Sequence, residues 1–214
     1  MNNKLIIIIY AFIVSITSTA SLASDELEPL YTDPWSLTYE DLIVDIQGYK
    51  VPSLVAFKGW ALLNKNEKRL IEIKEQFLAA GIKETMPLYL VLLQGTDWTH
   101  TKSTLFTLPD DKNIPKMINT IRFIQTYIEP EIGLVIPVSG ERTAEYNQEA
   151  GGASQSKHLS FCALDVVPKD SIDRTVLHEK LLHIFNTVGK KYNVGLGLYS
   201  GVRFHIDTCG FRQW

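Results

Sequence analysis

The sequence has no run of basic residues, and its 24 acidic residues outnumber its 21 basic ones, which gives a formal net charge of −3. A protein that binds the phosphate backbone needs clustered Lys and Arg, so nucleic acid is not an expected partner. Internal repeats and low-complexity segments are also missing. With 45% apolar and 21% charged residues, the chain has a globular composition, and 214 residues suffice for one domain with an elaboration.

Long hydrophobic runs are absent except at the N-terminus. A basic start at Lys4 leads into an apolar run over residues 5–16, and residues 21–23, Ser-Leu-Ala, have the pattern of a cleavage site. The apolar run is too short for a comfortable membrane span. We expect residues 1–23 to be a signal peptide and the protein to be periplasmic or secreted, with an uncleaved anchor as the alternative. No later run is long enough to span a membrane, so no span is expected after signal removal.

Helices and strands are expected along the rest of the chain. Apolar residues recur at helical spacing over residues 66–80, and residues 88–93 form a continuous apolar run typical of a buried strand. Similar signals predict helices over 115–127, 144–149 and 172–192, and strands over 134–138, 163–168 and 203–207. This order predicts an α+β fold with a small antiparallel sheet flanked by helices. We assign residues 111–214 to the domain and residues 24–110 to an N-terminal extension packed on it as one compact unit.

Two histidines and one aspartate stand out near the C-terminus: His158, Asp165 and His205. Two imidazoles and one carboxylate are a common ligand set for a catalytic zinc, which keeps a fourth position open. The spacing from His158 to Asp165 suits a loop that runs into a strand. In the strand over 203–207, the period of two places Arg203, His205 and Asp207 on one face. The alternative is three unrelated polar residues of a globular domain.

The surrounding residues give a more specific signal. Three groups of residues occur in order: Ser139-Gly-x-Arg142, Tyr146-Asn147 and Gly151-Gly152-Ala153; then Ser156-x-His158 and Asp165; then His205-Ile206-Asp207-Thr208 with Arg212 and Trp214. This ordered set resembles the zinc D-Ala-D-Ala peptidases of the M15 class. One departure is Phe161, where the family often has Gly, and a bulky residue there would narrow the cleft or change the turn.

The resemblance implies a fold, a metal and roles for several residues. The fold would be that of the hedgehog/D-Ala-D-Ala peptidases, and Zn²⁺ would be bound by His158, Asp165 and His205. Arg142 would stabilise an oxyanion or hold substrate, with a salt bridge that braces its loop as the alternative. Ser156 would contact substrate or cap a turn, and Tyr199 would contact substrate or serve only in packing.

The general base is not evident from the sequence. Related enzymes often have an acid or a histidine a few residues before the last ligand, but this chain has Gly201, Val202 and Arg203 there. Asp207, two residues after His205, is the remaining catalytic candidate. It would either activate water or orient a metal ligand by a hydrogen bond.

The two cysteines, Cys162 and Cys209, lie three residues before Asp165 and four after His205. If the two ligand strands are adjacent and antiparallel, the cysteines come roughly opposite each other, and export would permit a disulfide. Two separate buried thiols are the alternative. The other histidines, His100, His178 and His183, are expected away from the metal, since His178 and His183 are five apart and diverge on a helix.

These observations favour an exported zinc metallopeptidase, of the D-Ala-D-Ala carboxypeptidase or murein endopeptidase type, that hydrolyses a D-amino-acid-containing peptide bond in peptidoglycan. Its partners would be peptidoglycan peptides. One alternative is a zinc-containing module with a peptidase-like fold that binds the cell wall without catalysis. A second alternative is an exported structural protein with no metal.

Overall fold

The computed structural model describes residues 37–96 and 101–214. The expected signal peptide, residues 1–23, and His100 lie outside the described residues. Within the described ranges, no helix is both long enough and apolar enough to cross a membrane.

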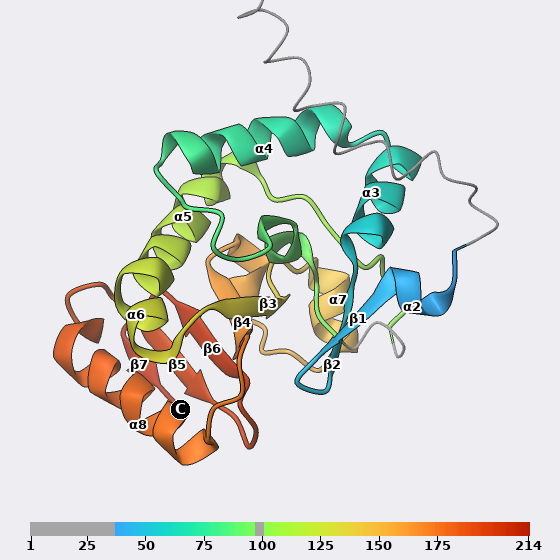
Figure 1. The fold of residues 1–214 in the computed structure, drawn as a ribbon. Coiled ribbons are helices and arrows are strands. Elements are labelled where there is room, and N and C mark those ends of the chain that lie inside the picture. The colour runs from blue at the N-terminus through green and yellow to red at the C-terminus, as the bar shows by residue number, and fades with distance from the viewer. Residues whose placement is uncertain (1–36, 97–100) are drawn as a thin grey trace, which may run out of the picture.

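The larger of two sheets has five strands in the order β3-β4-β6-β5-β7 (Figure 1). Its strands are β3 (Val135–Ser139), β4 (Ala163–Pro168), β5 (Gly195–Leu198), β6 (Phe204–Asp207) and β7 (Arg212–Gln213). All neighbouring pairs are antiparallel except β5 and β7, which are parallel. The expected sheet was small and antiparallel, whereas the observed five-stranded sheet is mixed. The difference arises because the chain reverses after β6 and then passes to the far edge of β5, where it must run parallel to β5.

The expected helices are present with changed ends. They are α4 (Glu67–Ala79), α5 (Ile114–Phe123), α7 (Ala144–Glu149) and α8 (Arg174–Ile184). Two continue as π-helical turns, η5 (Ile124–Ile128) after α5 and η7 (Phe185–Gly189) after α8. The remaining helical segments are short or lie near the start: α2 (Tyr39–Leu42), α3 (Leu54–Leu63), η4 (Asp111–Asn113), α6 (Glu129–Ile132) and η6 (Lys157–Ser160).

The strand expected over residues 88–93 is wrong, because this segment forms the 3-10 helix η3 (Leu88–Leu92). A short apolar run is compatible with either a buried strand or a buried helix, so periodicity could not separate them. The carbonyl groups of Val91 and Leu93 accept hydrogen bonds from Glu141 and Gly140. The buried turn therefore supports the chain where it leaves β3.

A small hairpin, β1 (Ile43–Ile46) and β2 (Tyr49–Pro52), precedes α3. It packs on the rest of the protein through Gln47, whose Nε2 donates to the carbonyls of Pro168 and Asp170 at 2.9 Å each. The same hydrophobic core includes residues from both parts of the chain, such as Phe77 and Ile121. The division at residue 110 stays a prediction.

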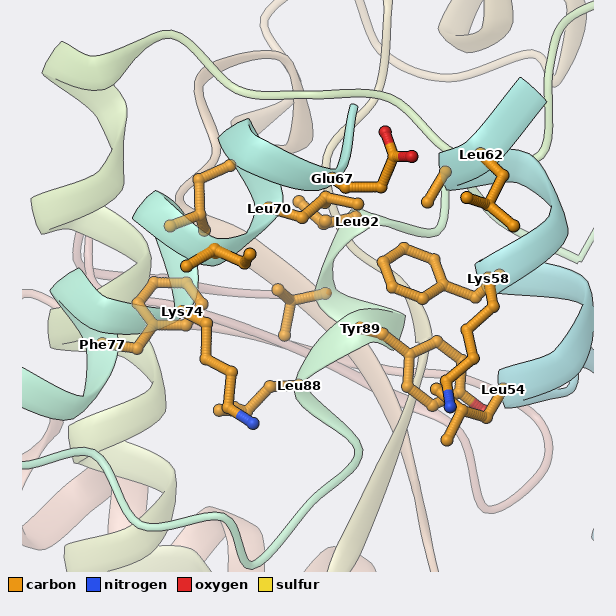
Figure 2. A pocket seen from close by; sticks show the side chains of 15 residues that line it. Leu54, Lys58, Leu62, Glu67, Leu70, Lys74, Phe77, Leu88, Tyr89 and Leu92 are labelled. Atoms are coloured by element: carbon orange, nitrogen blue, oxygen red, sulfur yellow. The ribbon is translucent and has the colours of Figure 1, made fainter. Parts of the chain in front are cut away.

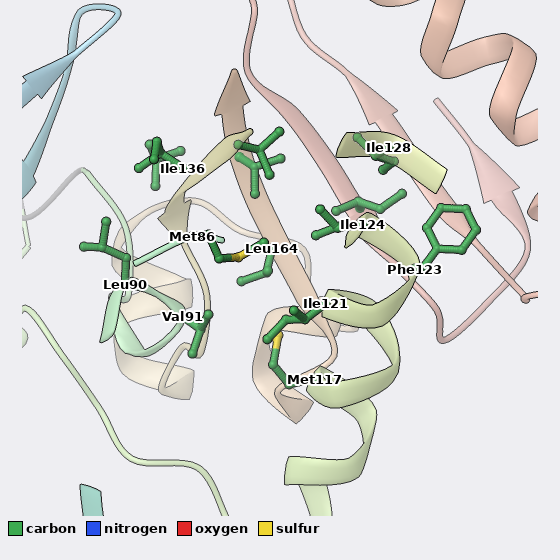
Figure 3. Close-up of a cluster of buried hydrophobic side chains, with 14 of the residues drawn as sticks. Met86, Leu90, Val91, Met117, Ile121, Phe123, Ile124, Ile128, Ile136 and Leu164 are labelled. Carbon is green, nitrogen blue, oxygen red and sulfur yellow. The ribbon is translucent and has the colours of Figure 1, made fainter. Parts of the chain in front are cut away.

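A large part of the core lies on one face of the larger sheet. Figure 3 shows Met117, Ile121 and Ile124 of the α5–η5 helix beside Leu164 of β4. Ile206 of β6 lies on this face as well, next to side chains of η5 and α8. Because side chains alternate along a strand, Asp165 and His205 lie on the opposite face.

An apolar hollow of about 280 Å³ lies between α3 and α4, with η3 as its floor. Figure 2 shows Leu62 and Leu70 on its walls, with Leu88 and Tyr89 between the two helices. Its lining contains none of the candidate metal ligands.

Candidate metal centre

The strand register places Ser139 and Gly197 beside Asp165 and His205. Asp165 of β4 is paired with His205 of β6, Ser139 of β3 is paired with Asp165, and Gly197 of β5 is paired with His205. Ser139 reaches this register through an irregularity after Pro137. Proline is tolerated there because β3 is an edge strand of the sheet. The sheet thus fixes two of the three expected ligands side by side.

His158 comes from η6, in the loop before β4, and its ring lies against the same face. Its Nδ1 is 2.7 Å from the carbonyl oxygen of Gly140. A carbonyl only accepts, so Nδ1 carries the proton and Nε2 keeps a free lone pair. The loop geometry therefore presents Nε2 of His158 to the other two residues.

Three ligand atoms converge in the centre. Nε2 of His158 lies 3.3 Å from Nδ1 of His205 and 3.4 Å from Oδ1 of Asp165, and the last two atoms are 3.1 Å apart. All three residues are buried, with exposures of 2%, 3% and 4% for His158, Asp165 and His205. Within the described residues this is the group of histidine, cysteine and acidic side chains that could hold a metal ion.

The charges at this centre shift the pKa values of the three residues. Burial alone would raise the pKa of Asp165, but the polar and charge interactions with the imidazoles of His158 and His205 hold it well below its usual value. Burial lowers the pKa of His158. Burial also opposes protonation of His205, but its hydrogen bonds to Asp165 and Asp207 raise its pKa overall. The carboxylate is therefore ionised, as a metal ligand must be.

Asp207 lies behind His205. Its Oδ2 accepts from Nε2 of His205 at 2.9 Å and from Arg212 at 2.7 Å, and its Oδ1 accepts from the backbone of Cys209 at 2.8 Å. The residue is fully buried. Its bond fixes the proton of His205 on Nε2 and leaves Nδ1 free to face Asp165. Of the two roles open from the sequence, this position fits the orienting one, because Asp207 contacts the ring nitrogen that points away from the centre.

Arg142 contacts one of the candidate ligands. Its Nη2 donates to Oδ2 of Asp165 at 3.2 Å and to Oγ of Ser139 at 2.7 Å. Its Nε donates to the carbonyl of Gln94 at 3.0 Å. These contacts correspond to the alternative role of Arg142, a salt bridge that braces its loop. They also keep the positive charge of the guanidinium beside the centre.

The two expected substrate residues differ in their surroundings. The hydroxyl of Tyr199 lies 3.4 Å from Oδ1 of Asp165, so this side chain reaches the centre. Burial raises the pKa of Tyr199 to about 12, and the nearby Asp165 adds to this effect. Ser156 precedes η6, and within residues 37–96 and 101–214 its hydroxyl makes no hydrogen bond, so it does not cap the turn.

Phe161 does not narrow the site. Its ring is buried in the core at 6.4 Å from the ring of Phe77. Its backbone has φ 49°, in the left-handed region that favours glycine. The bulky side chain of Phe161 is therefore accommodated in the hydrophobic core, where it is fully buried.

The structure contains the disulfide between Cys162 and Cys209, with Cα atoms 6.4 Å apart. The pair lies next to Ala163 and Asp207, which are paired in register on β4 and β6. The bond therefore ties together the two strands that carry Asp165 and His205. His178 and His183 of α8 lie outside the metal-ligand group, as expected.

Sequence reasoning missed several supporting residues. Gln94 is fully buried; its carbonyl accepts from Ser139 and Arg142, and its side-chain oxygen accepts from Thr143. A side chain at Gly197 would lie 2.7 Å from the ring of Trp214, and one at Gly195 would lie 2.3 Å from Asp207. The spacing of Gly195 and Gly197, two residues apart and so on one face of β5, could have indicated that this face is closely packed.

Comparison with known proteins agrees with this geometry. No curated protein and no solved structure matches the chain. Residues 94–195 match the family model described as Peptidase M15. The matched stretch contains Arg142, His158 and Asp165, and the fold then supplies His205 from the strand beyond it. The match over residues 94–195 and the ligand geometry together support the assignment of this part of the chain to the peptidase M15 family.

Proposed function

We propose that the protein is an exported zinc-dependent peptidase that hydrolyses a peptide bond beside a D-amino acid in bacterial peptidoglycan. The match to the M15 family model supports a peptidase. The signal-peptide pattern of residues 1–23 supports export to the periplasm or beyond. Zinc and the D-amino-acid substrate follow from the ligand set and from the resemblance of the ordered motifs.

The spacing of the three ligand atoms carries the zinc proposal. Tetrahedral ligands at the preferred zinc distance of about 2.0–2.2 Å lie about 3.3–3.6 Å from each other. The observed separations between His158, Asp165 and His205 are 3.1–3.4 Å. Two neutral nitrogens and one carboxylate oxygen also match the donor types of catalytic zinc. Zinc, when bound there, supplies Lewis acidity toward a water molecule and a peptide carbonyl.

The residues around the ligands have distinct tasks. Gly140 and Asp207 fix the protons of the two histidines so that Nε2 of His158 and Nδ1 of His205 face inward. Arg142 balances the charge of Asp165. Its own guanidinium would also stabilise the negative charge that develops on a substrate oxygen. Tyr199 keeps its proton at neutral pH, because its pKa is about 12, and can donate a hydrogen bond to bound substrate.

One observation favours the alternative of a cell-wall-binding module without catalysis. In the described part of the chain, the carboxylates that contact the ligand residues are Asp165 and Asp207, and Asp207 is already bonded to His205 and Arg212. No free carboxylate in that part of the chain contacts the ligands to act as a general base. Turnover is therefore the property that separates the two functions.

The test is metal analysis combined with digestion of purified peptidoglycan and mass identification of the released fragments. We expect about one zinc per chain and fragments cut at a peptide bond beside a D-residue. His158→Ala should lose both, and His183→Ala, which changes an exposed histidine of α8, should lose neither. Zinc without released fragments would support the binding module. Zinc and hydrolysis that both survive His158→Ala would refute the site.

A further inference from the structure

Arg203 is the residue that directly precedes β6, on the same strand face as His205. Its guanidinium carbon lies 4.4 Å from the ring centre of Tyr199 and 5.7 Å from that of Tyr49. Two tyrosine rings therefore hold one cation beside the metal centre. Arginine suits such a position because its planar guanidinium can stack on rings and still donate in its own plane.

Arg203 differs from the other two arginines of the site. Arg142 forms an ion pair with Asp165, and Arg212 forms one with Asp207. Arg203 has no ion pair in the part of the chain that the structure describes, and its Nε is buried without a protein hydrogen-bond partner. Burying a donor without a partner is unfavourable, so this guanidinium is arranged to receive an acceptor from elsewhere.

The distance to the metal centre suits a substrate group. Tyr199 stacks on Arg203 with its ring and reaches Oδ1 of Asp165 with its hydroxyl, at 3.4 Å. Arg203 and His205 are two residues apart on one strand, or about 7 Å between Cα atoms. This separation corresponds to about two residues of an extended peptide at about 3.3 Å per residue.

The N-terminal hairpin completes this arrangement. Tyr49 belongs to β2, and Gln47 fixes the hairpin to the end of β4. A side chain at Gly201 would lie 3.4 Å from the hydroxyl of Tyr49, so the hairpin packs closely on the loop before β6. The hairpin lies outside the stretch that matches the family model, residues 94–195. A segment of the extension thus contributes to the surroundings of the site.

We propose that Arg203, held between Tyr49 and Tyr199, binds a carboxylate of the substrate peptide within about two residues of the cleaved bond. The proposal rests on the proposed peptidase function. The carboxylate is either the C-terminal α-carboxylate of the peptide or an acidic side chain within it. A guanidinium recognises both through the same pair of parallel hydrogen bonds.

The experiment uses the zinc-loaded protein and two pairs of synthetic peptides. The first pair is acetyl-Lys-D-Ala-D-Ala and its C-terminal amide. The second pair is acetyl-Glu-D-Ala-D-Ala amide and acetyl-Gln-D-Ala-D-Ala amide. In wild-type protein, the pair with the larger preference for its carboxylate member shows whether Arg203 binds the C-terminal carboxylate or an acidic side chain. We measure kcat, KM and, by calorimetry, the Kd of each peptide.

Arg203→Gln should lower kcat/KM for the preferred carboxylate peptide by about 10- to 100-fold, mainly through KM, and leave its uncharged partner unchanged. Arg203→Lys should lower kcat/KM less than Arg203→Gln does, because Lys keeps the positive charge but cannot form the two parallel hydrogen bonds of a guanidinium. Zinc content should not change in either variant. Lys68→Gln, which removes an exposed charge elsewhere, should match wild type on all four peptides.

An equal loss on carboxylate and uncharged peptides would overturn the proposal and assign Arg203 a structural role. Equal binding of all four peptides by wild type would also overturn it. If wild type cleaves none of them, the proposed peptidase reaction fails for these substrates. The Kd values then still decide Arg203, since its loss must weaken only the carboxylate peptides.

Discussion

Asp207 accepts a hydrogen bond from Nε2 of His205 at 2.9 Å, on the side of the imidazole that faces away from Asp165. The bond selects the tautomer that leaves Nδ1 free and fixes the ring plane. Arg212 in turn fixes Asp207, because it donates a hydrogen bond to the same carboxylate oxygen at 2.7 Å. The C-terminal residues of the chain thus determine how a ligand on β6 is presented.

Asp207→Asn should weaken zinc binding by about 10- to 100-fold, because the amide supports the histidine proton less well. Competition with a chelator measures this affinity. Asp110→Asn, which changes an exposed carboxylate paired with exposed Lys112, should leave it unchanged. If Asp207→Asn abolishes turnover at full zinc occupancy and unchanged affinity, Asp207 acts as the general base after all.

Gly197→Ala should destabilise the protein and disturb the centre. The added methyl group would lie 2.7 Å from the ring of Trp214 and 3.0 Å from Cβ of His205. Overpacking of this kind costs about 1–3 kcal/mol of unfolding free energy, which urea denaturation can measure. Gly59→Ala is the matched control, because its methyl group meets nothing within 4 Å and lies in α3. That variant should be as stable as wild type or slightly more stable.

Removal of the disulfide by Cys162→Ala with Cys209→Ala should cost about 2–4 kcal/mol of unfolding free energy. The bond closes a loop with a sequence separation of 47, which contains both β4 and β6. Zinc affinity should fall as well, since the cysteines lie one residue from Ala163 and two residues from Asp207, which are paired on β4 and β6. Denaturation and chelator competition measure the two effects. A stability loss with unchanged zinc affinity would show that the strands hold the ligands without the bond.

Glu141 is expected to make the stability of the protein depend on pH. It is buried with 7% exposure, and its Oε2 has no hydrogen-bond partner among the described residues. Burial raises its pKa to about 8, with a smaller increase from Asp110 and opposing effects of the Phe161 backbone and Lys116. The folded state therefore favours the protonated form.

Because the pKa in the folded state is raised, the stabilising effect of the neutral carboxyl is complete below about pH 4.5 and is lost as pH rises through about 8. Glu141→Gln mimics the neutral carboxyl, so the variant should gain stability over wild type between these pH values, by a few kcal/mol. Chemical denaturation of both proteins at pH 5 and pH 9 measures the difference. Parallel pH profiles would show that Glu141 is ionised in the folded protein.

Several features of the fold and site could be predicted from the sequence because they depend on local pattern. The amphipathic spacing over residues 66–80 predicted α4, and the alternation before His205 predicted β6. The residue types of His158, Asp165 and His205 predicted a metal site, and the placement of the cysteines near the ligand strands predicted their pairing. The apolar run of η3 was predicted as a strand because local pattern does not distinguish two buried conformations.

The sequence by itself determined which chemical groups are available and which local helices and strands can form, since both depend only on residue type and spacing. Only the tertiary structure decided their tasks, because hydrogen bonds between distant residues select tautomers, charges and orientation. Asp207 became a residue that orients His205 because Arg212 and the backbone of Cys209 hold it behind the ring. Arg142 came to brace Asp165 because Ser139 and the buried Gln94 position its guanidinium. Neither arrangement follows from spacing along the chain, since it depends on strand register and on packing between segments far apart in sequence.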